Sequence, residues 1–320
     1  WSSMASSQGA PALLRSSASA ALALAALQLP WWPRISFWKQ LLASFLCGYL
    51  VSCLDGAEKR PGRRRSPWLL SAVQRFWNNV LPVLFDIDCK LEDKEGLRKC
   101  GNCIVAVHPH GVLSLGHYLV ISGFHPDLDA ALPARERCAL SAGVLFKLPV
   151  VRELALGLGC VDAHREVAKK CLSEGLSLSV VPGGEREQLL AQRGPVEQLV
   201  LAHRQGFVRL GLQHGVPIVP VYVFGEAQLF KQSRFLMSFR SWVQRTLGVA
   251  LVLPYGPSGV PWQKFPSPIR IVAGKPMSLP RIPEPSKADV EEHHARYVEE
   301  LRQLFERHKA ASGYPDHRLE

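Results

Sequence analysis

The residues best suited to chemistry form the tetrapeptide His108-Pro109-His110-Gly111, which follows the apolar run 103–107. Imidazole titrates near neutrality, so two histidines delivered by a buried strand could supply a general base. Pro109 fixes one backbone angle, and Gly111 permits a tight turn or the close approach of a ligand. The same histidines could instead be turn residues that hydrogen-bond to the backbone, and the tetrapeptide alone does not decide between the two.

A second motif follows another apolar run, and it combines two glycines with charged residues. Its members are Pro182, Gly183, Gly184, Glu185, Arg186 and Glu187. The glycines free backbone N–H groups to approach an anion or an oxyanion. Either glutamate could orient a histidine, and the arginine could meet a phosphate. The alternative is an ordinary Gly-Gly turn with a solvated charge cluster.

Two single residues are further candidates. Arg165 opens a predicted helix after a short strand, a position suited to phosphate contact, although it could equally be a helix-surface arginine. Glu226 follows the predicted strand 217–224, where it could be an active-site carboxylate or a first-turn residue that interacts with a helix dipole. No Gly-x-Ser-x-Gly elbow is present, which argues against a serine acyl-enzyme.

The elements that must position these residues alternate along the chain from about residue 102. Short Val-, Ile- and Leu-rich runs without polar alternation predict strands at 104–107, 177–181, 217–224 and 269–273. The intervening stretches predict helices at 111–121, 145–158, 165–174, 196–213 and 289–308, with loops at 254–268 and 276–287. Such alternation predicts a three-layer α/β domain.

Composition restricts the partners. The chain has 320 residues, 47% of them hydrophobic, and a formal charge of +11, which favours an anionic membrane face or a phosphate-rich molecule over nucleic acid. Its 8 cysteines are scattered, and the lone pair Cys100 and Cys103 is more typical of structural residues than of zinc or redox chemistry. A metal held by His108 and His110 would need a third ligand that the sequence does not place, so no metal is expected.

The first third of the chain reads as a membrane or targeting region. No acidic residue precedes Asp55, and two apolar stretches, 18–29 and 35–54, flank a Pro-Trp-Trp-Pro turn. This pattern predicts a helical hairpin that embeds in or crosses a membrane, and the basic run 58–65 places the main domain on the cytosolic side. Residues 4–29 also resemble a transit peptide, because they are rich in Ser and Ala and lack acids.

These features give three parts: a targeting or first membrane segment at 1–34, a membrane segment with a basic linker at 35–66, and a catalytic domain at 67–320. The stretch 68–86 predicts an amphipathic helix broken by Pro82, which would lie at an interface or pack on the domain.

Several motifs in order resemble the type-2 diacylglycerol acyltransferase family, which includes the monoacylglycerol and wax-alcohol enzymes. They are HPHG, PGGEREQL, RQGFVRLGLQHGVPIVPVYVFGE, PIRIVAGKPMSLP and ELRQLFERHKAASGYP, spread over roughly residues 68–315. The chain departs from the related glycerolipid acyltransferases that carry a His–four residues–Asp motif, because Leu113 and Leu115 occupy the two possible Asp positions. Any carboxylate that orients a histidine must therefore come from elsewhere. Val105-Ala106-Val107 also replaces the family's tyrosine-glycine-tyrosine approach to the motif.

The resemblance implies a glycerolipid-acyltransferase-like domain that moves a fatty acyl group from acyl-CoA to diacylglycerol, making triacylglycerol at the endoplasmic reticulum membrane or lipid-droplet surface. Acyl-CoA is a substrate, and no cofactor is implied. The alternative acceptors are monoacylglycerol and a long-chain alcohol. A further alternative is a non-catalytic membrane protein that binds lipid or acyl-CoA, and a homo-oligomer is left open.

The reaction gives each candidate a role. A histidine base activates the lipid hydroxyl, with His110 slightly favoured over His108, and glycine N–H groups hold the oxyanion. Glu187, Glu185 and Glu226 compete as the orienting carboxylate, and Arg165 and Arg186 are assigned to the CoA phosphates.

Overall fold

The computed structural model describes residues 36–247, 250–255 and 267–320, and their contacts divide the chain after Lys59. The first apolar stretch, 18–29, and the Pro-Trp-Trp-Pro turn lie outside the described residues, so the hairpin prediction can be followed only in its second arm. That arm forms helix α2 (Phe37–Ser52), followed by the short helix η2 (Ala57–Lys59). By length and composition, Phe37–Lys59 could cross a membrane.

The second unit, residues 60–320, is built on one mixed sheet. Its strands are β1 (Ile87–Leu91), β2 (Ile104–His108), β3 (Arg137–Ser141), β4 (Cys160–Asp162), β5 (Ser177–Val180), β7 (Ile218–Phe224) and β10 (Ile269–Ala273). They lie in the order β1-β10-β7-β2-β5-β3-β4. Strands β7, β2, β5, β3 and β4 run parallel, whereas β10 is antiparallel to β7 and carries β1 parallel to itself. The carboxyl ends of the five parallel strands therefore share one edge.

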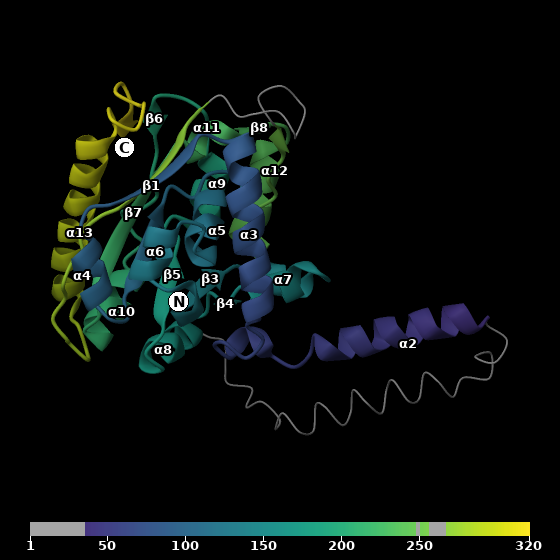
Figure 1. The fold of residues 1–320 in the computed structure, drawn as a ribbon. Helices are drawn as coiled ribbons and strands as arrows, with labels where there is room; N and C mark the ends of the chain where they lie inside the picture. Colours follow the sequence, from purple (N-terminus) through teal and green to yellow (C-terminus); the bar gives the residue numbers. More distant parts are fainter. Residues whose placement is uncertain (1–35, 248–249, 256–266) are drawn as a thin grey trace. The chain divides into compact units, whose positions relative to one another are not determined.

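Helices occupy both faces of this sheet, and α3 and α13 lie on opposite sides of it (Figure 1). The helices are α3 (Pro67–Leu84), α4 (Lys94–Lys99), α5 (Leu115–Ser122), α6 (Pro126–Ala131), α7 (Val151–Gly157), α8 (Arg165–Ser173), α9 (Gly184–Leu190), α10 (Gly206–His214), α11 (Glu226–Leu229), α12 (Met237–Leu247) and α13 (Lys287–His308). Two 3₁₀ helices, η3 (Ala134–Glu136) and η4 (Gly143–Lys147), flank β3. Two short strand pairs, β6 (Val196–Glu197) with β11 (Arg318–Leu319) and β8 (Lys231–Gln232) with β9 (Pro254–Tyr255), lie outside the sheet.

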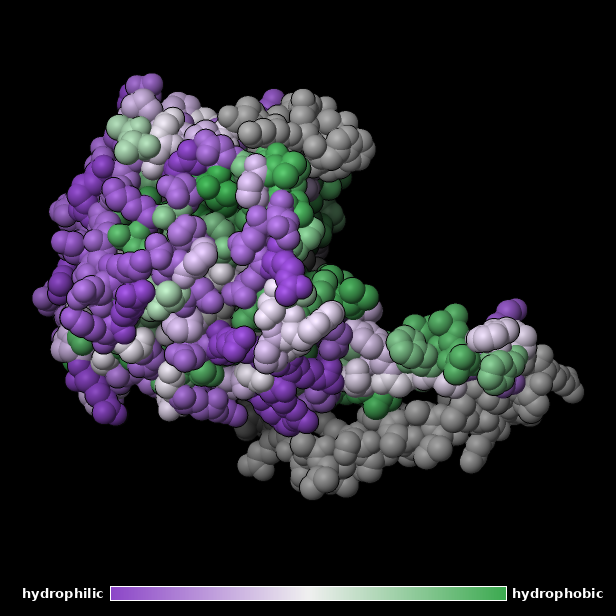
Figure 2. Space-filling view, in the orientation of Figure 1, coloured by the Kyte–Doolittle hydropathy of each residue, from purple (hydrophilic) through white to green (hydrophobic). Residues whose placement is uncertain are grey.

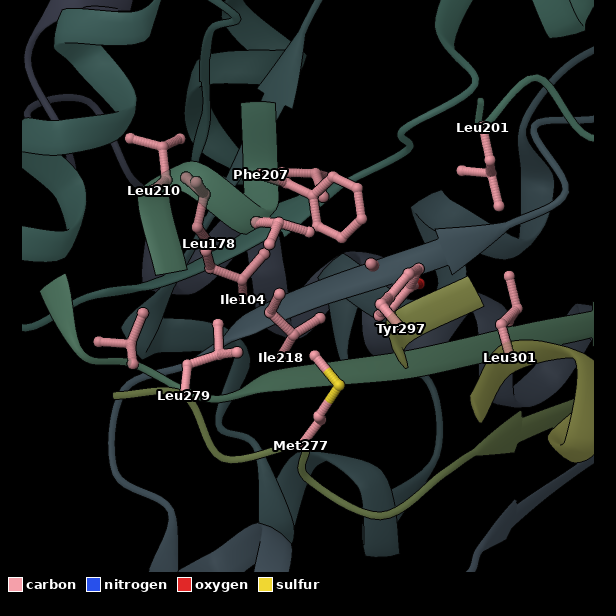
Figure 3. Close-up of a cluster of buried hydrophobic side chains, with 14 of the residues drawn as sticks. Ile104, Leu178, Leu201, Phe207, Leu210, Ile218, Met277, Leu279, Tyr297 and Leu301 are labelled. Carbon is pink, nitrogen blue, oxygen red and sulfur yellow. The ribbon is translucent and has the colours of Figure 1, made fainter. Parts of the chain in front are cut away.

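Alternation along the strands fills a core on each face. Ile104 and Ala106 of β2 pack toward α8, α10 and α13, in the cluster drawn in Figure 3, whereas Val105 and Val107 pack toward α3, α4, α5 and α6. Side chains two residues apart on a strand point to the same face, so His108 continues the row of Ile104 and Ala106. The predicted three-layer α/β arrangement is confirmed, with the sheet as its middle layer.

Three predicted helices differ from the observed ones. The helix expected at 111–121 begins only at Leu115, because Gly111 and Ser114 adopt left-handed backbone angles, with φ of +61° and +56°. The stretch 145–158 divides into η4 and α7 around Pro149, since the residue before a proline disfavours the helical region. Most of 196–213 is not helical, because residues 196–197 pair with a distant strand and α10 begins at Gly206.

Pro82 does not break α3, which continues to Leu84. A proline lacks the backbone N–H and therefore removes one helical hydrogen bond. Because Pro82 lies two residues before the end of α3, no further turn of the helix is lost. The short strand expected before Arg165 is β4. Strands β1 and β3 were not among the sequence predictions, and each lacks the uninterrupted apolar run that identifies a strand buried on both faces.

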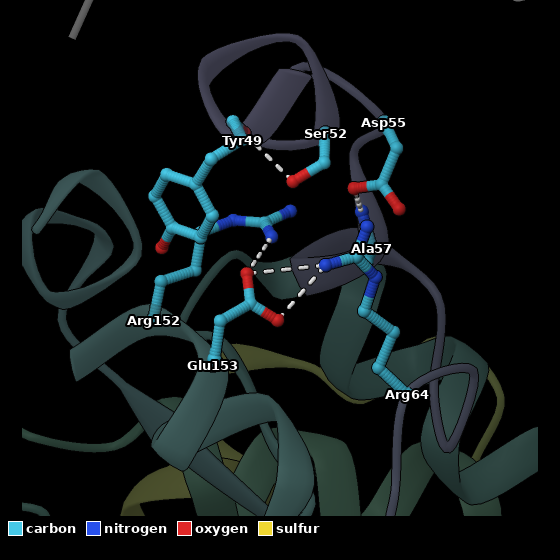
Figure 4. A network of polar contacts seen from close by, with 7 residues as sticks. All are labelled: Tyr49, Ser52, Asp55, Ala57, Arg64, Arg152 and Glu153. Atoms are coloured by element: carbon cyan, nitrogen blue, oxygen red, sulfur yellow. Dashed lines mark hydrogen bonds and ion pairs between the residues drawn. The ribbon is translucent and has the colours of Figure 1, made fainter. Parts of the chain in front are cut away.

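Part of the basic linker is used structurally. Arg64 places one guanidinium nitrogen 2.9 Å from a Glu153 carboxylate oxygen on α7, and Arg152 contacts the other oxygen at the same distance (Figure 4). Arg65 donates to the backbone carbonyls of Arg135 and Arg137. These arginines therefore fix residues 64 and 65 to the rest of the sheet unit.

Candidate active site

The three motifs singled out in the sequence meet at the shared carboxyl edge of the parallel strands. The HPHG tetrapeptide ends β2, the Pro-Gly-Gly motif follows β5 on one side of β2, and Gly225-Glu226 follows β7 on the other. Ligand sites in α/β folds form at this edge, where the loops after neighbouring strands meet. We therefore place the candidate active site here.

His108 lies inside the protein. Its side chain has no exposed surface, and Nε2 is 2.8 Å from the Tyr297 hydroxyl of α13. Nδ1 has no partner among the described residues. Burial lowers the pKa of His108 to about 3, so the ring is neutral at pH 7. This histidine links β2 to α13 and is closed off from solvent.

His110 is half-buried and has the protonation pattern of a base. Its Nδ1 lies 3.0 Å from the Gly111 carbonyl oxygen. A carbonyl can only accept, so the proton of the neutral ring is on Nδ1 and Nε2 keeps its lone pair. Burial lowers the pKa of His110, which favours the neutral form. Among the described residues, neither HPHG imidazole is hydrogen-bonded to a carboxylate.

Glu187 supports the histidine turn through the backbone. One carboxylate oxygen accepts the His110 N–H at 2.5 Å, and the other accepts the Val200 N–H at 3.0 Å. The side chain is 1% exposed, and burial raises the pKa of Glu187. Glu187 therefore holds the peptide of His110 rather than its ring. Glu185, the alternative on the same helix, is half-buried, and burial also raises its pKa.

Glu226 has a similar role on the other side of β2. Its two carboxylate oxygens accept the N–H groups of Leu115 and Gly116 at 2.9 and 2.8 Å, at the start of α5. The sequence left open whether Glu226 is an active-site carboxylate or a partner of a helix dipole. In the structure its carboxylate lies at the amino end of α5, where it can interact with the dipole of that helix. Burial nevertheless raises the pKa of Glu226 to about 7.

The Pro-Gly-Gly motif forms a turn between β5 and α9. Pro182 occupies its middle, and the Gly184 N–H donates to the Val181 carbonyl at 3.1 Å. The Gly183 N–H has no protein acceptor among the described residues. A methyl group on Gly183 would lie 1.9 Å from Glu187 Oε2, so only glycine fits beside this carboxylate.

A groove of about 380 Å³ opens beside the HPHG turn. It is lined by Pro109, Gly111, Glu187, Leu190, Ala191, Gln192, Arg193, Gly194, Pro195, Val196, Glu197, Gln198, Ala227 and Arg234. The residues on either side of His110 both contribute to this lining. His110 itself is not among the lining residues, so the groove adjoins the turn that carries this half-buried histidine.

The groove contains two arginines that sequence reasoning missed. Arg193 donates to the Gln228 carbonyl at 2.5 Å, and Arg234 donates to the Gln192 side chain at 2.7 Å. In the described structure neither guanidinium contacts a carboxylate. Each is an isolated arginine in sequence, so only the loop geometry could have identified them.

The two arginines proposed from sequence lie elsewhere. Arg165 is exposed at the start of α8, after β4, which is three strands from β2, or roughly 14 Å at about 4.8 Å per strand. It does not line the groove. Arg186 is exposed on α9, the helix that supplies Glu187.

Two buried neutral histidines predict sensitivity to acid. His117, whose Nε2 lies 3.1 Å from the Ser179 hydroxyl, has its pKa lowered by burial to about 3, as has His108. Below pH 6.5 the unfolded chain binds protons that the folded chain excludes, so the free energy of unfolding falls as the pH drops from 6.5 toward 3. At pH 4.5 each histidine contributes roughly 2–3 kcal/mol to this loss, at about 1.4 kcal/mol per pH unit.

Glu226 acts in the opposite sense, because its raised pKa makes folding less favourable as the pH rises from 4.5 to 7. Because these two effects oppose each other in the parent protein, the prediction compares the pH-dependent fall in Tm between variants. The fall in Tm of the purified full chain from pH 7 to 4.5 should be several degrees smaller in His117→Gln than in the parent. The exposed His203→Gln is the control, and equal falls in all three proteins would contradict the prediction.

Comparisons with known proteins agree with the order of motifs. The family model for diacylglycerol acyltransferase matches residues 35–320. Diacylglycerol O-acyltransferase 2 of Bos taurus is 33% identical over 86% of this chain and 78% of its own length. The Homo sapiens protein of that name is 32% identical over 86% and 72%, and diacylglycerol O-acyltransferase 2-like protein 6 of Homo sapiens is 32% identical over 80% and 79%.

Among solved structures, the 1-acyl-sn-glycerophosphate (LPA) acyltransferase PlsC of Thermotoga maritima is similar with a TM-score of 0.46 and 19% identity, over 74% of this chain and 78% of that one. The family match covers all the described residues and includes every motif at the sheet edge. The chain therefore belongs to the diacylglycerol acyltransferase family and is an acyltransferase.

Proposed function

We propose that this protein transfers a fatty acyl group from acyl-CoA to the free hydroxyl of diacylglycerol, giving triacylglycerol and CoA. The observation that carries the proposal is the position of His110, whose Nδ1 lies 3.0 Å from the Gly111 carbonyl and whose two chain neighbours line a groove at the edge where the three motifs meet. The names of the relatives support the choice of diacylglycerol as acceptor.

His110 acts as the general base. Its Nε2 takes the proton from the lipid hydroxyl while that oxygen attacks the thioester carbonyl carbon, because an alcohol is a poor nucleophile until it loses its proton. The Gly111 carbonyl holds the Nδ1 proton and stabilises the imidazolium that forms. Glu187 fixes the peptide that carries the ring.

The tetrahedral intermediate places negative charge on the former carbonyl oxygen. We assign the Gly183 N–H to this oxyanion, because the Gly184 N–H is already donated within the turn. Collapse of the intermediate breaks the carbon–sulfur bond, and His110 returns its proton to the departing CoA thiolate. The net reaction moves one acyl group and one proton and needs no other reactant.

The substrate dissolves in lipid, and two features support action at a membrane. Helix α2 could embed or cross, with the sheet unit on the cytosolic side of the endoplasmic reticulum. Among the described residues between 235 and 255 of the sheet unit, seven large apolar side chains are each at least 40% exposed: Phe235, Leu236, Phe239, Trp242, Leu251, Leu253 and Tyr255. Apolar side chains gather over α3, α7 and α12 in Figure 2. Because this apolar segment follows Arg234 of the groove, it would give diacylglycerol a short route from the bilayer.

The test uses membranes from a host that lacks neutral-lipid synthesis. Labelled oleoyl-CoA is supplied with diacylglycerol, monoacylglycerol or hexadecanol, and labelled triacylglycerol is expected from diacylglycerol. A preference for another acceptor would keep the mechanism and change the substrate, and no product from well-expressed protein would refute acyl transfer to these acceptors. Recovery of the chain in the soluble fraction would contradict the membrane proposal.

We propose that Arg193 and Arg234 bind the CoA phosphates, with Arg186 nearby on α9, because phosphate oxygens would supply the anionic partner that the groove arginines lack. Arg234→Gln should raise the KM for acyl-CoA by at least about tenfold, since losing a charge-assisted hydrogen bond costs roughly 1.5–3 kcal/mol. Arg165→Gln, on the far strand, is the matched control.

The comparison substrate is an acyl-pantetheine thioester, which lacks those phosphates. Arg234→Gln and the parent should use it with equal KM. An unchanged KM for acyl-CoA in Arg234→Gln, or a tenfold rise in Arg165→Gln, would move the phosphate site away from the groove.

A further inference from the structure

The segment that follows α13 lies along one wall of the groove. Its strand β11 pairs in parallel with β6, which lines the groove. The Arg318 N–H donates to the Pro195 carbonyl at 2.8 Å, and the Glu320 N–H donates to the Glu197 carbonyl at 2.9 Å. Residues about 120 positions apart in sequence therefore build this wall together.

A buried carboxylate joins the wall to the segment. The Glu197 side chain is 1% exposed, and both of its oxygens are used. One accepts the Tyr222 hydroxyl of β7 at 2.5 Å, and the other lies 2.8 Å from His317 Nδ1. Without His317, the second oxygen would be left buried without a partner, which is costly for a charged group.

The same wall continues to the catalytic turn. Three residues beyond Glu197, the Val200 N–H donates to Glu187, and the other oxygen of Glu187 accepts the His110 N–H. The position of β6 therefore sets where the Val200 amide lies. That amide fixes one end of a carboxylate whose other end holds His110.

We propose that residues 314–320 are a positioning element of the active site, which acts on His110 through the contact of His317 with Glu197, the pairing of β11 with β6, and Glu187. The segment has its own anchor, because the Tyr314 hydroxyl donates to the Pro268 carbonyl at 2.5 Å. His317 and Arg318 are thus positioning residues that touch no substrate. The catalytic consequence rests on the proposed function, whereas the positioning of the turn does not.

Two matched pairs of variants test the element in the full chain in membranes. His317→Leu removes the contact with Glu197, whereas the amide of His317→Asn can still donate to it. Arg318→Pro removes the backbone N–H that binds Pro195, whereas Arg318→Gln changes only an exposed side chain. His317→Leu and Arg318→Pro should each lower kcat about tenfold, with the KM for acyl-CoA changed less, and the partner variants should match the parent.

A double-mutant cycle separates positioning from general destabilisation. If the segment acts through Glu187, adding His317→Leu to Glu187→Gln should lower kcat no further than Glu187→Gln alone. Multiplied losses in the double variant, or equal kcat in all four segment variants, would overturn the proposal.

Hydrogen exchange gives a readout that does not need activity. The amides of His110 and Val200 should exchange at least tenfold faster in His317→Leu than in the parent and unchanged in Arg318→Gln. Unchanged exchange in His317→Leu would refute the positioning element and leave the proposed function intact. If the parent enzyme transfers no acyl group, the function fails, and these two amides still decide whether residues 314–320 position the turn.

Discussion

Replacing His110 with alanine is expected to lower kcat by about 10²- to 10⁴-fold, the contribution typical of a positioned general base. The ring is half-buried, its Nδ1 proton is held by the Gly111 carbonyl, and burial lowers its pKa, so Nε2 is free to accept the hydroxyl proton at pH 7. The KM for acyl-CoA should change little, because the ring makes no contact with the groove arginines. The measurement is steady-state acyl transfer by membranes that contain equal amounts of each variant.

His108 provides the contrast within the same tetrapeptide. It is fully buried against Tyr297, so His108→Ala removes a hydrogen bond between β2 and α13 and leaves a cavity. Its main effect should be a lower Tm, with residual kcat per folded molecule well above that of His110→Ala. Loss of kcat in His108→Ala with full activity in His110→Ala would reverse the assignment of the base.

The layered fold could be predicted because its central strands are continuous apolar runs. Strand β10 lies at the predicted residues, 269–273, and β2, β5 and β7 lie within one residue of the predicted bounds. Strand β1 was missed because its side chains alternate between half-buried and exposed, as at an edge. Strand β3 was missed because it begins with Arg137. A charged residue is not expected in a buried strand, although Arg137 is in fact buried.

Sequence could predict the motifs of the candidate site but not the distant residues that contact them. HPHG, Pro-Gly-Gly and Gly225-Glu226 each end a strand, so parallel pairing brings them together without further information. The partners of these motifs are remote: Tyr297 lies 189 residues after His108, and Glu226 lies 111 residues after the Leu115 amide it accepts. No periodicity or spacing encodes such contacts. For that reason sequence analysis could propose the carboxylates but could not say that they bind backbone amides.

Gly111→Ala should be as damaging as loss of the base, although it removes no functional group. Gly111 has φ of +61°, and a methyl group there would lie 2.5 Å from Glu226 Cγ and 2.6 Å from Oε1. The glutamate cannot retreat easily, because it is buried and holds the Leu115 and Gly116 amides. The turn itself must therefore shift, and it carries the neighbouring His110. A displacement of about 1 Å at a catalytic group can cost 10²-fold, so kcat should fall by about that factor or more.

Gly101→Ala is the matched control, because Gly101 has nearly the same backbone angle, φ of +65°, but open space around the added methyl group. A left-handed alanine costs about 1–2 kcal/mol, so Gly101→Ala should lose stability to that extent and Gly111→Ala should lose more, because of its contact with Glu226. Only Gly111→Ala should lose activity per folded molecule. If both variants kept full kcat, the turn could shift without loss of activity. The Glu226 carboxylate would then not be what determines the position of His110. If both lost kcat equally, backbone strain and not the contact with Glu226 would be responsible. The expected asymmetry would show that Glu226, which touches neither imidazole, limits where the base can lie.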